Sequence, residues 1–180
     1  MLSKVKEFVT ESFGKEHPHL ERTLYWIEEL KPDASEELLI AARSHDIERA
    51  FQPKADGSKK FSYSWGEAMD KHQIDSGKIM FEFLAKEGYD LEKAKRVQEL
   101  ISKHEVGGDA EQNLLMDADS LSWLEMSAPR HMGFIEEKGL EKKELKKKID
   151  FMFNRISSEK AKVIAGPFYD EAIKLLEKLD

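Results

Sequence analysis

Residues 43 to 50, RSHDIERA, place a histidine and an aspartate side by side after the apolar run LLIAA. Adjacent side chains on an α-helix point about 100° apart, so His45 and Asp46 do not normally share a partner. At a helix terminus the backbone can relax, and both side chains can then converge on one metal ion or on two neighbouring ions. A buried aspartate also needs a cation, because burying an unpaired carboxylate is costly. The pair therefore predicts a metal site.

Further side chains that can bind a metal occur near the ends or bends of other predicted helices. They are His19, His72, His104 and Asp119. A helical bundle can gather such groups at its centre, since facing helices project side chains inward. Asp119 follows Leu115 by four residues and borders the apolar side of its helix. Imidazoles and carboxylates without thiolates suit Mn²⁺, Fe²⁺, Ni²⁺, Co²⁺ or Zn²⁺, and the set does not choose among these metals.

The elements that must position these residues are predicted to be helices, which makes the fold class all-α. Apolar residues recur at helical spacing, and no alternating run or hairpin signal interrupts them. The predicted helical segments include 5–13, 19–30, 65–88, 90–104, 110–126 and 168–179. Residues 51–64 are predicted to form a loop, residues 138–148 a charged exposed face, and Gly166 with Pro167 a break. Gly88 is expected to end its helix.

Composition limits the classes of function. The chain has 180 residues, a formal net charge of -7 and no cysteine. The negative charge disfavours binding to extended nucleic acid, because proteins that bind its backbone are usually basic. The lack of thiols excludes disulfides and cysteine nucleophiles. With no apolar membrane segment and no secretory signal, we expect a soluble cytoplasmic protein, and the oligomeric state stays open.

The ordered set resembles the HD-domain superfamily of metal-dependent phosphohydrolases. The signature of that family is a histidine, then an HD pair, then an aspartate in a short apolar context, all on a helical bundle. HLERTLYWI, SHD and DADSL match these elements. By resemblance, one metal would be held by His19, His45, Asp46 and Asp119. The likeness covers about residues 16 to 125, and we expect a metal-binding domain over 1–137 with a C-terminal helical extension, 138–180, packed on it.

Members with two metals add histidines between the HD pair and the final aspartate. KHQIDSGKIMFEFL and ISKHEVGG resemble those segments, which gives His72 and His104. Some members carry two adjacent histidines where this chain has His104 and Glu105. Glu105 is therefore either a further ligand or a departure that weakens the second site.

Two positions have competitors. Asp117 competes with Asp119 for the carboxylate role, and we favour Asp119 from its side of the helix. Asp117 is then expected to be exposed or to act behind the ligands. His17 competes with His19, and the spacing to Arg22 favours His19. A lone histidine is more often a capping or core residue than a ligand, which is also the expectation for His131.

The resemblance implies a phosphohydrolase that uses one or two divalent ions and activated water to cleave a small phosphate ester, in the first place a nucleotide. By resemblance Asp46 would contact both ions and orient the attacking water. Glu48, two residues later, is a candidate general acid or base. Arg43, Lys103 and Arg130 flank the predicted ligands and are expected to bind substrate phosphate.

Two other functions suit the same residues. The first is an HD-type di-iron oxygenase that acts on a small organic substrate. The second is a domain without catalytic activity that binds a nucleotide. In the predicted loop, Lys54, Lys59 and Lys60 with neighbouring aromatic residues would either hold a nucleobase and phosphate or only favour solubility.

Overall fold

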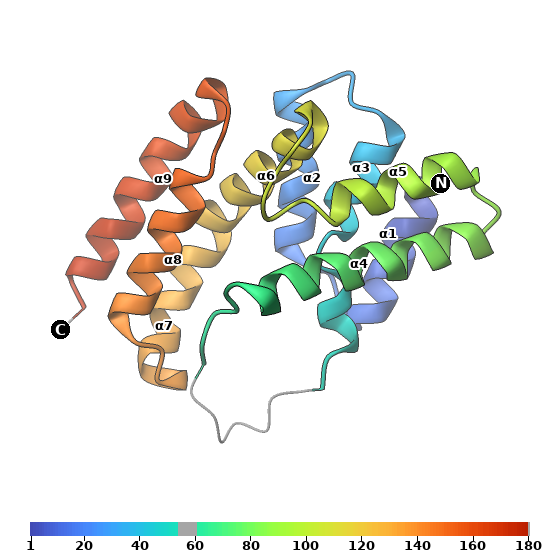
Figure 1. The fold of residues 1–180 in the computed structure, drawn as a ribbon. Coiled ribbons are helices and arrows are strands. Elements are labelled where there is room, and N and C mark those ends of the chain that lie inside the picture. The colour runs from blue at the N-terminus through green and yellow to red at the C-terminus, as the bar shows by residue number, and fades with distance from the viewer. Residues whose placement is uncertain (54–60, 180) are drawn as a thin grey trace.

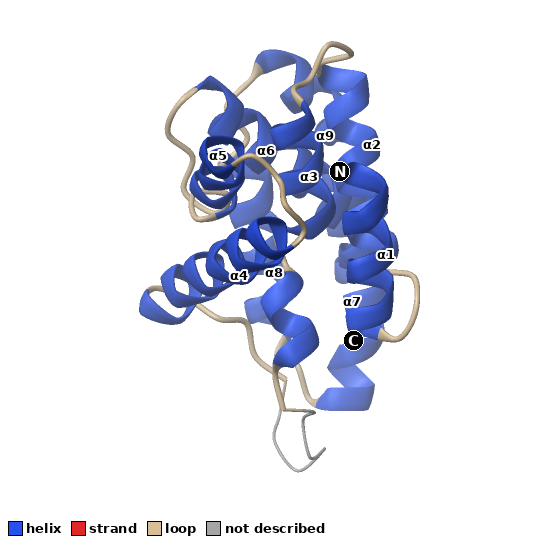
Figure 2. Ribbon diagram, turned by 90° about the vertical axis from the view of Figure 1, so that its right-hand side faces the viewer, coloured by secondary structure: helices blue, strands red, loops and turns tan. Residues whose placement is uncertain are grey.

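The computed structural model describes residues 1–53 and 61–179, and the loop residues Lys54, Lys59 and Lys60 lie outside this part of the chain. Its elements are α1 (Leu2–Phe13), α2 (Pro18–Leu30), α3 (Glu36–Ser44), η1 (Ile47–Phe51), α4 (Glu67–Lys86), α5 (Leu91–Ile101), α6 (Ala110–Ser122), η2 (Trp123–Ser127), α7 (Ala128–Lys138), α8 (Lys142–Asn154) and α9 (Glu159–Glu177). Figure 2 shows helices and loops, with no strand in the described ranges. The predicted all-α class is confirmed.

Helix α6 lies between two groups of helices (Figure 1). Helices α1 to α5 lie on one side of it, and α7, α8 and α9 lie on the other side. Helix α6 packs against α2, α3 and α5 in the first group and against α8 and α9 in the second. A residue that faces inward from α6 can therefore meet side chains from both groups.

Within the described residues, no helix is long and apolar enough to cross a membrane.

Several helices begin and end at local sequence signals. Ser35 Oγ accepts a hydrogen bond from the Leu38 amide at 3.2 Å at the start of α3. Asp109 and Gln112 form a capping box at the start of α6. Gly88 follows α4 with a φ of 75°, a conformation that glycine adopts without strain, so the predicted end of this helix is confirmed.

Two expectations for the C-terminal part are wrong. Gly166 and Pro167 do not break the chain, because α9 continues through both residues. Proline removes the hydrogen bond to the carbonyl four residues earlier, which belongs to Val163. Val163 is 75% exposed, so water can replace the missing donor. Lys148, expected on a charged exposed face, is only 8% exposed and lies inside the fold.

An ion pair fixes α2 against the π-helical turn η2, which continues α6 into α7. The Glu125 carboxylate accepts hydrogen bonds from Arg22 Nε at 2.5 Å and from Arg22 Nη2 at 2.8 Å. The Trp26 indole nitrogen donates to the same carboxylate at 3.0 Å. Because His19 lies one turn before Arg22 on α2, this contact also holds His19 next to α6.

Asp117 joins α6 to the C-terminal helices. Its carboxylate is fully buried and accepts hydrogen bonds from the amides of Ser157 at 2.6 Å and Ser158 at 3.0 Å, where α9 begins. The expectation that Asp117 is exposed is therefore wrong. Its helix face points toward the start of α9, which the sequence of α6 alone does not show.

Removing this carboxylate should destabilise the fold. We expect Asp117→Ala to lower the free energy of unfolding by about 2 to 3 kcal/mol, because two amides lose their acceptor in a buried place. Urea unfolding measures the change. Asp170→Ala on the exposed side of α9 is the control and should stay close to wild type. Equal stability of the two variants would contradict the capping role.

Candidate metal centre

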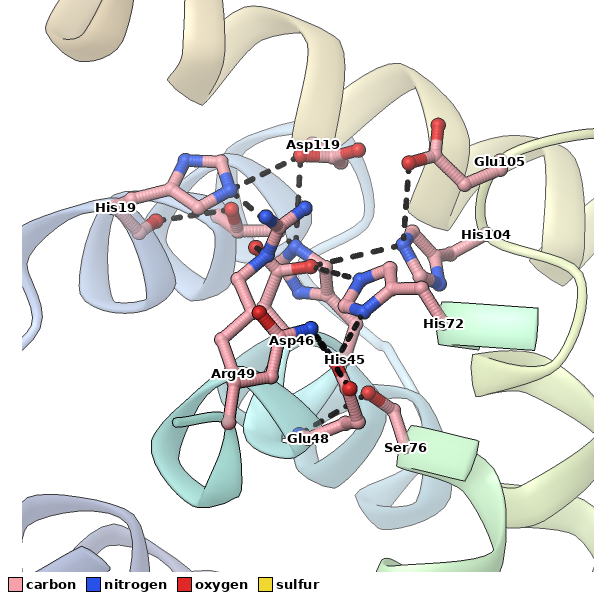
Figure 3. Close-up of polar contacts among 12 residues, drawn as sticks. His19, His45, Asp46, Glu48, Arg49, His72, Ser76, His104, Glu105 and Asp119 are labelled. Atoms are coloured by element: carbon pink, nitrogen blue, oxygen red, sulfur yellow. Dashed lines mark hydrogen bonds and ion pairs between the residues drawn. The ribbon is translucent and has the colours of Figure 1, made fainter. Parts of the chain in front are cut away.

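The six predicted ligands lie together where the first group of helices meets α6 (Figure 3). Helix α2 carries the first of them, the turn after α3 the next two, α4 and the turn after α5 one each, and α6 the last. They are His19, His45, Asp46, His72, His104 and Asp119. Five of these residues are buried, and the side chain of His19 is 11% exposed.

A first group of ligand atoms comes from α2, α3 and α6. His19 Nε2 lies 3.1 Å from Asp119 Oδ1, and His45 Nε2 lies 3.4 Å from the same oxygen. The two imidazole nitrogens are 3.3 Å apart. Neighbouring ligands of a transition metal stand about 3 Å apart, because each bond is about 2.1 Å long. The three atoms therefore have the spacing of a ligand set.

A second group forms around Asp46. His72 Nε2 lies 2.6 Å from Asp46 Oδ1, and His104 Nε2 lies 3.9 Å from it. Ligand atoms of Asp46, His72 and His104 all lie within 4.8 Å of one another. The same limit holds for Asp46 with His19 and His45. Asp46 thus belongs to both groups, which is the position of a ligand shared by two ions.

Hydrogen bonds on the far side of the rings fix three of the imidazoles. His45 Nδ1 donates to the Ala42 carbonyl at 3.1 Å, and His104 Nδ1 donates to the Ile101 carbonyl at 2.7 Å, because a carbonyl can only accept.

The third ring is fixed by Ser122. Its single hydroxyl hydrogen goes to the His19 carbonyl at 2.8 Å. His19 Nδ1, which is 2.8 Å from the same hydroxyl oxygen, must therefore be the donor. In the neutral form of His19, as in neutral His45 and His104, Nε2 then carries a lone pair that points into the cluster.

Both carboxylates stay ionised in this buried place. Burial alone would raise the pKa of Asp46, but Arg49 and His72 outweigh it and hold the pKa well below its usual value. The pKa of Asp119 is also held well below its usual value, because Arg155 and the imidazoles of His19 and His45 outweigh burial. The site therefore offers anionic oxygens near neutral pH.

The imidazoles differ in how they bind protons. Burial lowers the pKa of His104 to about 4, and the nearby charge of His45 adds to this effect. Burial also acts on His45, but Asp119 outweighs it and raises the pKa above the ordinary value. For His72, Asp46 outweighs burial in the same direction. Without a metal, protons on His45 and His72 thus balance part of the negative charge.

These observations fit a transition-metal centre. The cluster brings together lone pairs of imidazoles and anionic oxygens, all of which accept hydrogen bonds or bind cations. The donor set of nitrogen and oxygen, with each ring oriented by a partner behind it, is typical of histidine and carboxylate metal sites. The residues present therefore suit one or two divalent ions.

Two arginines that the sequence did not single out contact the carboxylates. Arg49 Nε lies 2.7 Å from Asp46 Oδ2. Arg155, at the end of α8, pairs with Asp119 and Glu105. Arg49 follows Asp46 by three residues, a spacing that could have suggested the contact. Arg155 is far from its partners in sequence and carries no local signal. Since Arg155 pairs with Glu105, that carboxylate has a partner other than a metal.

The structure shows the surroundings of the three predicted phosphate-binding residues, whose role stays a prediction. Arg43 is buried, and its guanidinium approaches Thr10, Glu16 and Glu21 at 3.4 to 3.5 Å. Lys103 is exposed. Arg130 is exposed and lies 5.8 Å above the Phe134 ring.

The two histidines not chosen as ligands lie next to aromatic rings. The His17 ring is tilted against that of Phe13 at a centroid distance of 4.4 Å. His131 lies against Phe134 at 4.5 Å, and its Nδ1 is 2.7 Å from the Tyr63 hydroxyl. Neither ring belongs to a metal-binding group of described residues.

A polar pocket of about 270 Å³ opens beside the second ligand group. Its lining includes His72 and Glu48, together with the cations Arg49 and Lys71. The Glu48 carboxylate accepts a hydrogen bond from His72 Nδ1 at 2.8 Å and two more from Gln52 at 2.8 and 2.9 Å. A small anionic molecule could reach the cluster through this pocket.

Two solved structures share this fold over almost the whole chain. One is the crystal structure of a predicted HD superfamily hydrolase from an uncultured Thermotogales bacterium, with a TM-score of 0.64 and 17% identity, covering 98% of this chain and 89% of that one. The other is Bacillus subtilis YpgQ in complex with ADP, with a TM-score of 0.65 and 16% identity, covering 99% and 96%. The predicted resemblance to the HD superfamily is confirmed for the fold.

Residues 4–175 match the family described as "Domain of unknown function (DUF4202)". The match spans nearly the whole chain, so the protein belongs to this family. No curated protein matches the sequence.

The hydroxyl of Ser122 should contribute to metal affinity. We expect Ser122→Ala to weaken Mn²⁺ binding by about 10- to 100-fold, because His19 loses the partner that fixes its tautomer. Isothermal titration calorimetry measures the affinity. Ser44→Ala is the control, since the Ser44 hydroxyl is equally buried but donates only to the Ile40 carbonyl of its own helix. Equal affinities in both variants would argue against the assigned tautomer.

Metal binding should release protons. The raised pKa values of His45 and His72 mean that these rings keep their protons to a higher pH than a free imidazole, and a ligand nitrogen must lose its proton to bind a metal. Apparent Mn²⁺ affinity is therefore expected to rise from pH 6 to pH 8. Calorimetry in buffers of different ionisation enthalpy counts the protons. A pH-independent affinity without proton release would contradict the protonation states given above.

Proposed function

We propose that the protein is a metal-dependent phosphohydrolase that cleaves a small phosphate ester, in the first place a nucleotide. The observation that carries the proposal is the convergence of four imidazoles and two carboxylates beside a polar pocket. The HD-type fold and the ADP that YpgQ binds add support.

The metal ligands would be the six predicted residues, with Asp46 shared between the two groups. When bound, divalent ions polarise a phosphoryl oxygen and lower the pKa of water toward neutrality. Asp46 stays ionised because Arg49 pairs with its Oδ2 atom, which leaves Oδ1 available to the centre. His72 from α4 and His104 from the turn after α5 both approach Oδ1.

Glu48 would have a positioning role and the predicted acid or base role together. Its carboxylate accepts a hydrogen bond from His72 Nδ1–H and so directs His72 Nε2 toward Asp46. It also lines the pocket through which the leaving group would depart. A carboxylate in this place can give or take a proton at the leaving-group oxygen.

The charge of the centre suits a phosphate. Four carboxylates and two guanidiniums meet in and beside the ligand cluster. They are Asp46, Glu48, Glu105, Asp119, Arg49 and Arg155. Two divalent ions outweigh the remaining negative charge, so the loaded site attracts an anion despite the acidic surface of the whole protein. Arg49 is 48% exposed and lines the pocket, which makes it the cation we expect to meet the substrate first.

Hydrolysis can be tested directly. The protein loaded with Mn²⁺, Co²⁺ or Ni²⁺ should release phosphate or pyrophosphate from at least one member of a panel of nucleoside mono-, di- and triphosphates. Asp46→Asn should lower kcat by about 100-fold or more, because the shared ligand loses its charge. Phosphate release and metal content are measured on the same samples.

Asp170→Asn, far from the centre on the exposed side of α9, is the matched control and should keep wild-type activity. A metal-loaded protein that hydrolyses none of these compounds would refute the proposal. Equal loss of activity in both variants would show that the centre is not where the chemistry occurs.

A further inference from the structure

Lys148 of α8 is a buried cation that the metal centre described above does not use. It is 8% exposed, although its neighbours Lys146 and Lys147 on the same helix are exposed. Among the described residues its ammonium group makes no hydrogen bond and no ion pair. Burying an ammonium group without a partner costs several kcal/mol, so its place needs an explanation.

Aromatic rings surround the ammonium group. Lys148 Nζ lies 5.0 Å from the centroid of Phe151, 5.5 Å from Trp65, and 5.9 Å from both Tyr63 and Trp123. We call these four rings the aromatic cage. Ring faces attract a cation, and this attraction holds the lysine in place but supplies no hydrogen-bond acceptor.

A second donor of the cage is also without an acceptor. The Trp65 indole Nε1 is buried and has no hydrogen-bond partner among the described residues. Buried N–H groups are nearly always hydrogen-bonded, so this indole, next to an ammonium group without an ion pair, indicates a missing acceptor. Both the ammonium and the indole suit an anionic oxygen.

The cage adjoins the metal centre. Lys148 and Arg155 lie on the same side of α8, two turns apart, and both cations approach the ring of Phe151 between them, at 5.0 and 5.3 Å. Arg155 contacts Asp119 directly. Burial lowers the pKa of Lys148, and the charges of Glu105 and Asp119 partly offset the effect.

Arg155 takes the direct ion pairs of the two nearest buried carboxylates. It pairs with both Glu105 and Asp119. Among the described residues Lys148 makes no direct ion pair with either of them, so its ammonium group is left for an acceptor that the described protein does not supply. The segment that carries Tyr63 and Trp65 also lines the pocket beside His72 through Ser64, so the cage and the pocket share one wall.

We propose that Lys148 and the indole N–H of Trp65 form an anion subsite that binds a phosphate group of the substrate beside the metal centre. The proposal rests on the proposed function for the identity of the substrate, but phosphate binding itself does not require turnover. The aromatic cage holds the ammonium group ready, and the phosphate supplies the acceptor that both donors lack. Burial of the Lys148 cation destabilises the fold, but it positions the ammonium group for an anion before the anion binds.

The test compares two neighbouring lysines. Inorganic phosphate is titrated calorimetrically into the Mn²⁺-loaded wild-type protein and into Lys148→Met and Lys147→Met. We expect Lys148→Met to bind phosphate about 10- to 100-fold more weakly, because a charge-assisted contact is lost. Lys147 is exposed and lies 4.4 Å from the Trp65 ring, so Lys147→Met is a matched control and should bind as the wild type does.

Thermal stability separates binding from a structural role. Methionine fills an aromatic cage well and carries no charge to desolvate, so Lys148→Met should melt at or above the wild-type temperature. Trp65→Phe keeps a ring in the cage and removes its N–H, and should also weaken phosphate binding. A lower melting temperature of Lys148→Met together with unchanged phosphate affinity would overturn the proposal, as would equal losses in the two lysine variants.

The two proposals can fail separately. Weaker phosphate binding by Lys148→Met in a protein that hydrolyses no phosphate ester would support the subsite and refute the phosphohydrolase. Hydrolysis with the same KM and the same phosphate affinity in Lys148→Met and wild type would support the phosphohydrolase and refute the subsite.

Discussion

The centre of the bundle gathers groups that repel one another unless a positive charge lies between them. The Nε2 atoms of His19 and His45 lie 3.3 Å apart, and a carboxylate oxygen of Asp119 stands within 3.4 Å of both. Protons supply part of this positive charge in the metal-free protein, and divalent ions supply more of it. The hydrogen bonds behind each ring keep the groups in this arrangement, so the surrounding helices act as a rigid frame for a cation.

The adjacent residues His45 and Asp46 can share this frame because the helix ends before them. Helix α3 stops at Ser44, and Asp46 has a φ of -102° and a ψ of 15°, outside the helical region. His45 then turns toward His19 and Asp119, while Asp46 turns toward His72 and takes Arg49 on its outer oxygen. A helix that continued through these positions would point the two side chains about 100° apart.

The sequence was sufficient for the helices and for the convergence of the six ligands, because both leave periodic or ordered patterns in the chain. It was insufficient for the surroundings of Arg155 and Lys148, most of which come from parts of the chain that are distant in sequence. Lys148 lies in the lysine-rich run KKELKKK, but it follows Leu145 by three residues and precedes Met152 by four, so it falls on the buried face of α8. Its position beside Trp123 of η2 and the 61–65 segment is set by the tertiary packing. Pro167 was misjudged for a related reason, since the cost of a proline depends on whether water can reach the carbonyl that it leaves without a donor.

The C-terminal helices give the centre a second side. The predicted division of the chain near residue 137 separates the candidate metal ligands from the extension, and Arg155 of that extension contacts Asp119. Removing Arg155 would leave two buried carboxylates without their guanidinium partner, which is costly in a low-dielectric interior. The ligand cluster and the extension are therefore linked by charge as well as by packing. If Lys148 binds substrate as proposed, α8 leads to the arginine that pairs with the carboxylates of the centre and also carries the lysine that binds the anion. The stability of the centre and its specificity for a substrate would then depend on the same helix.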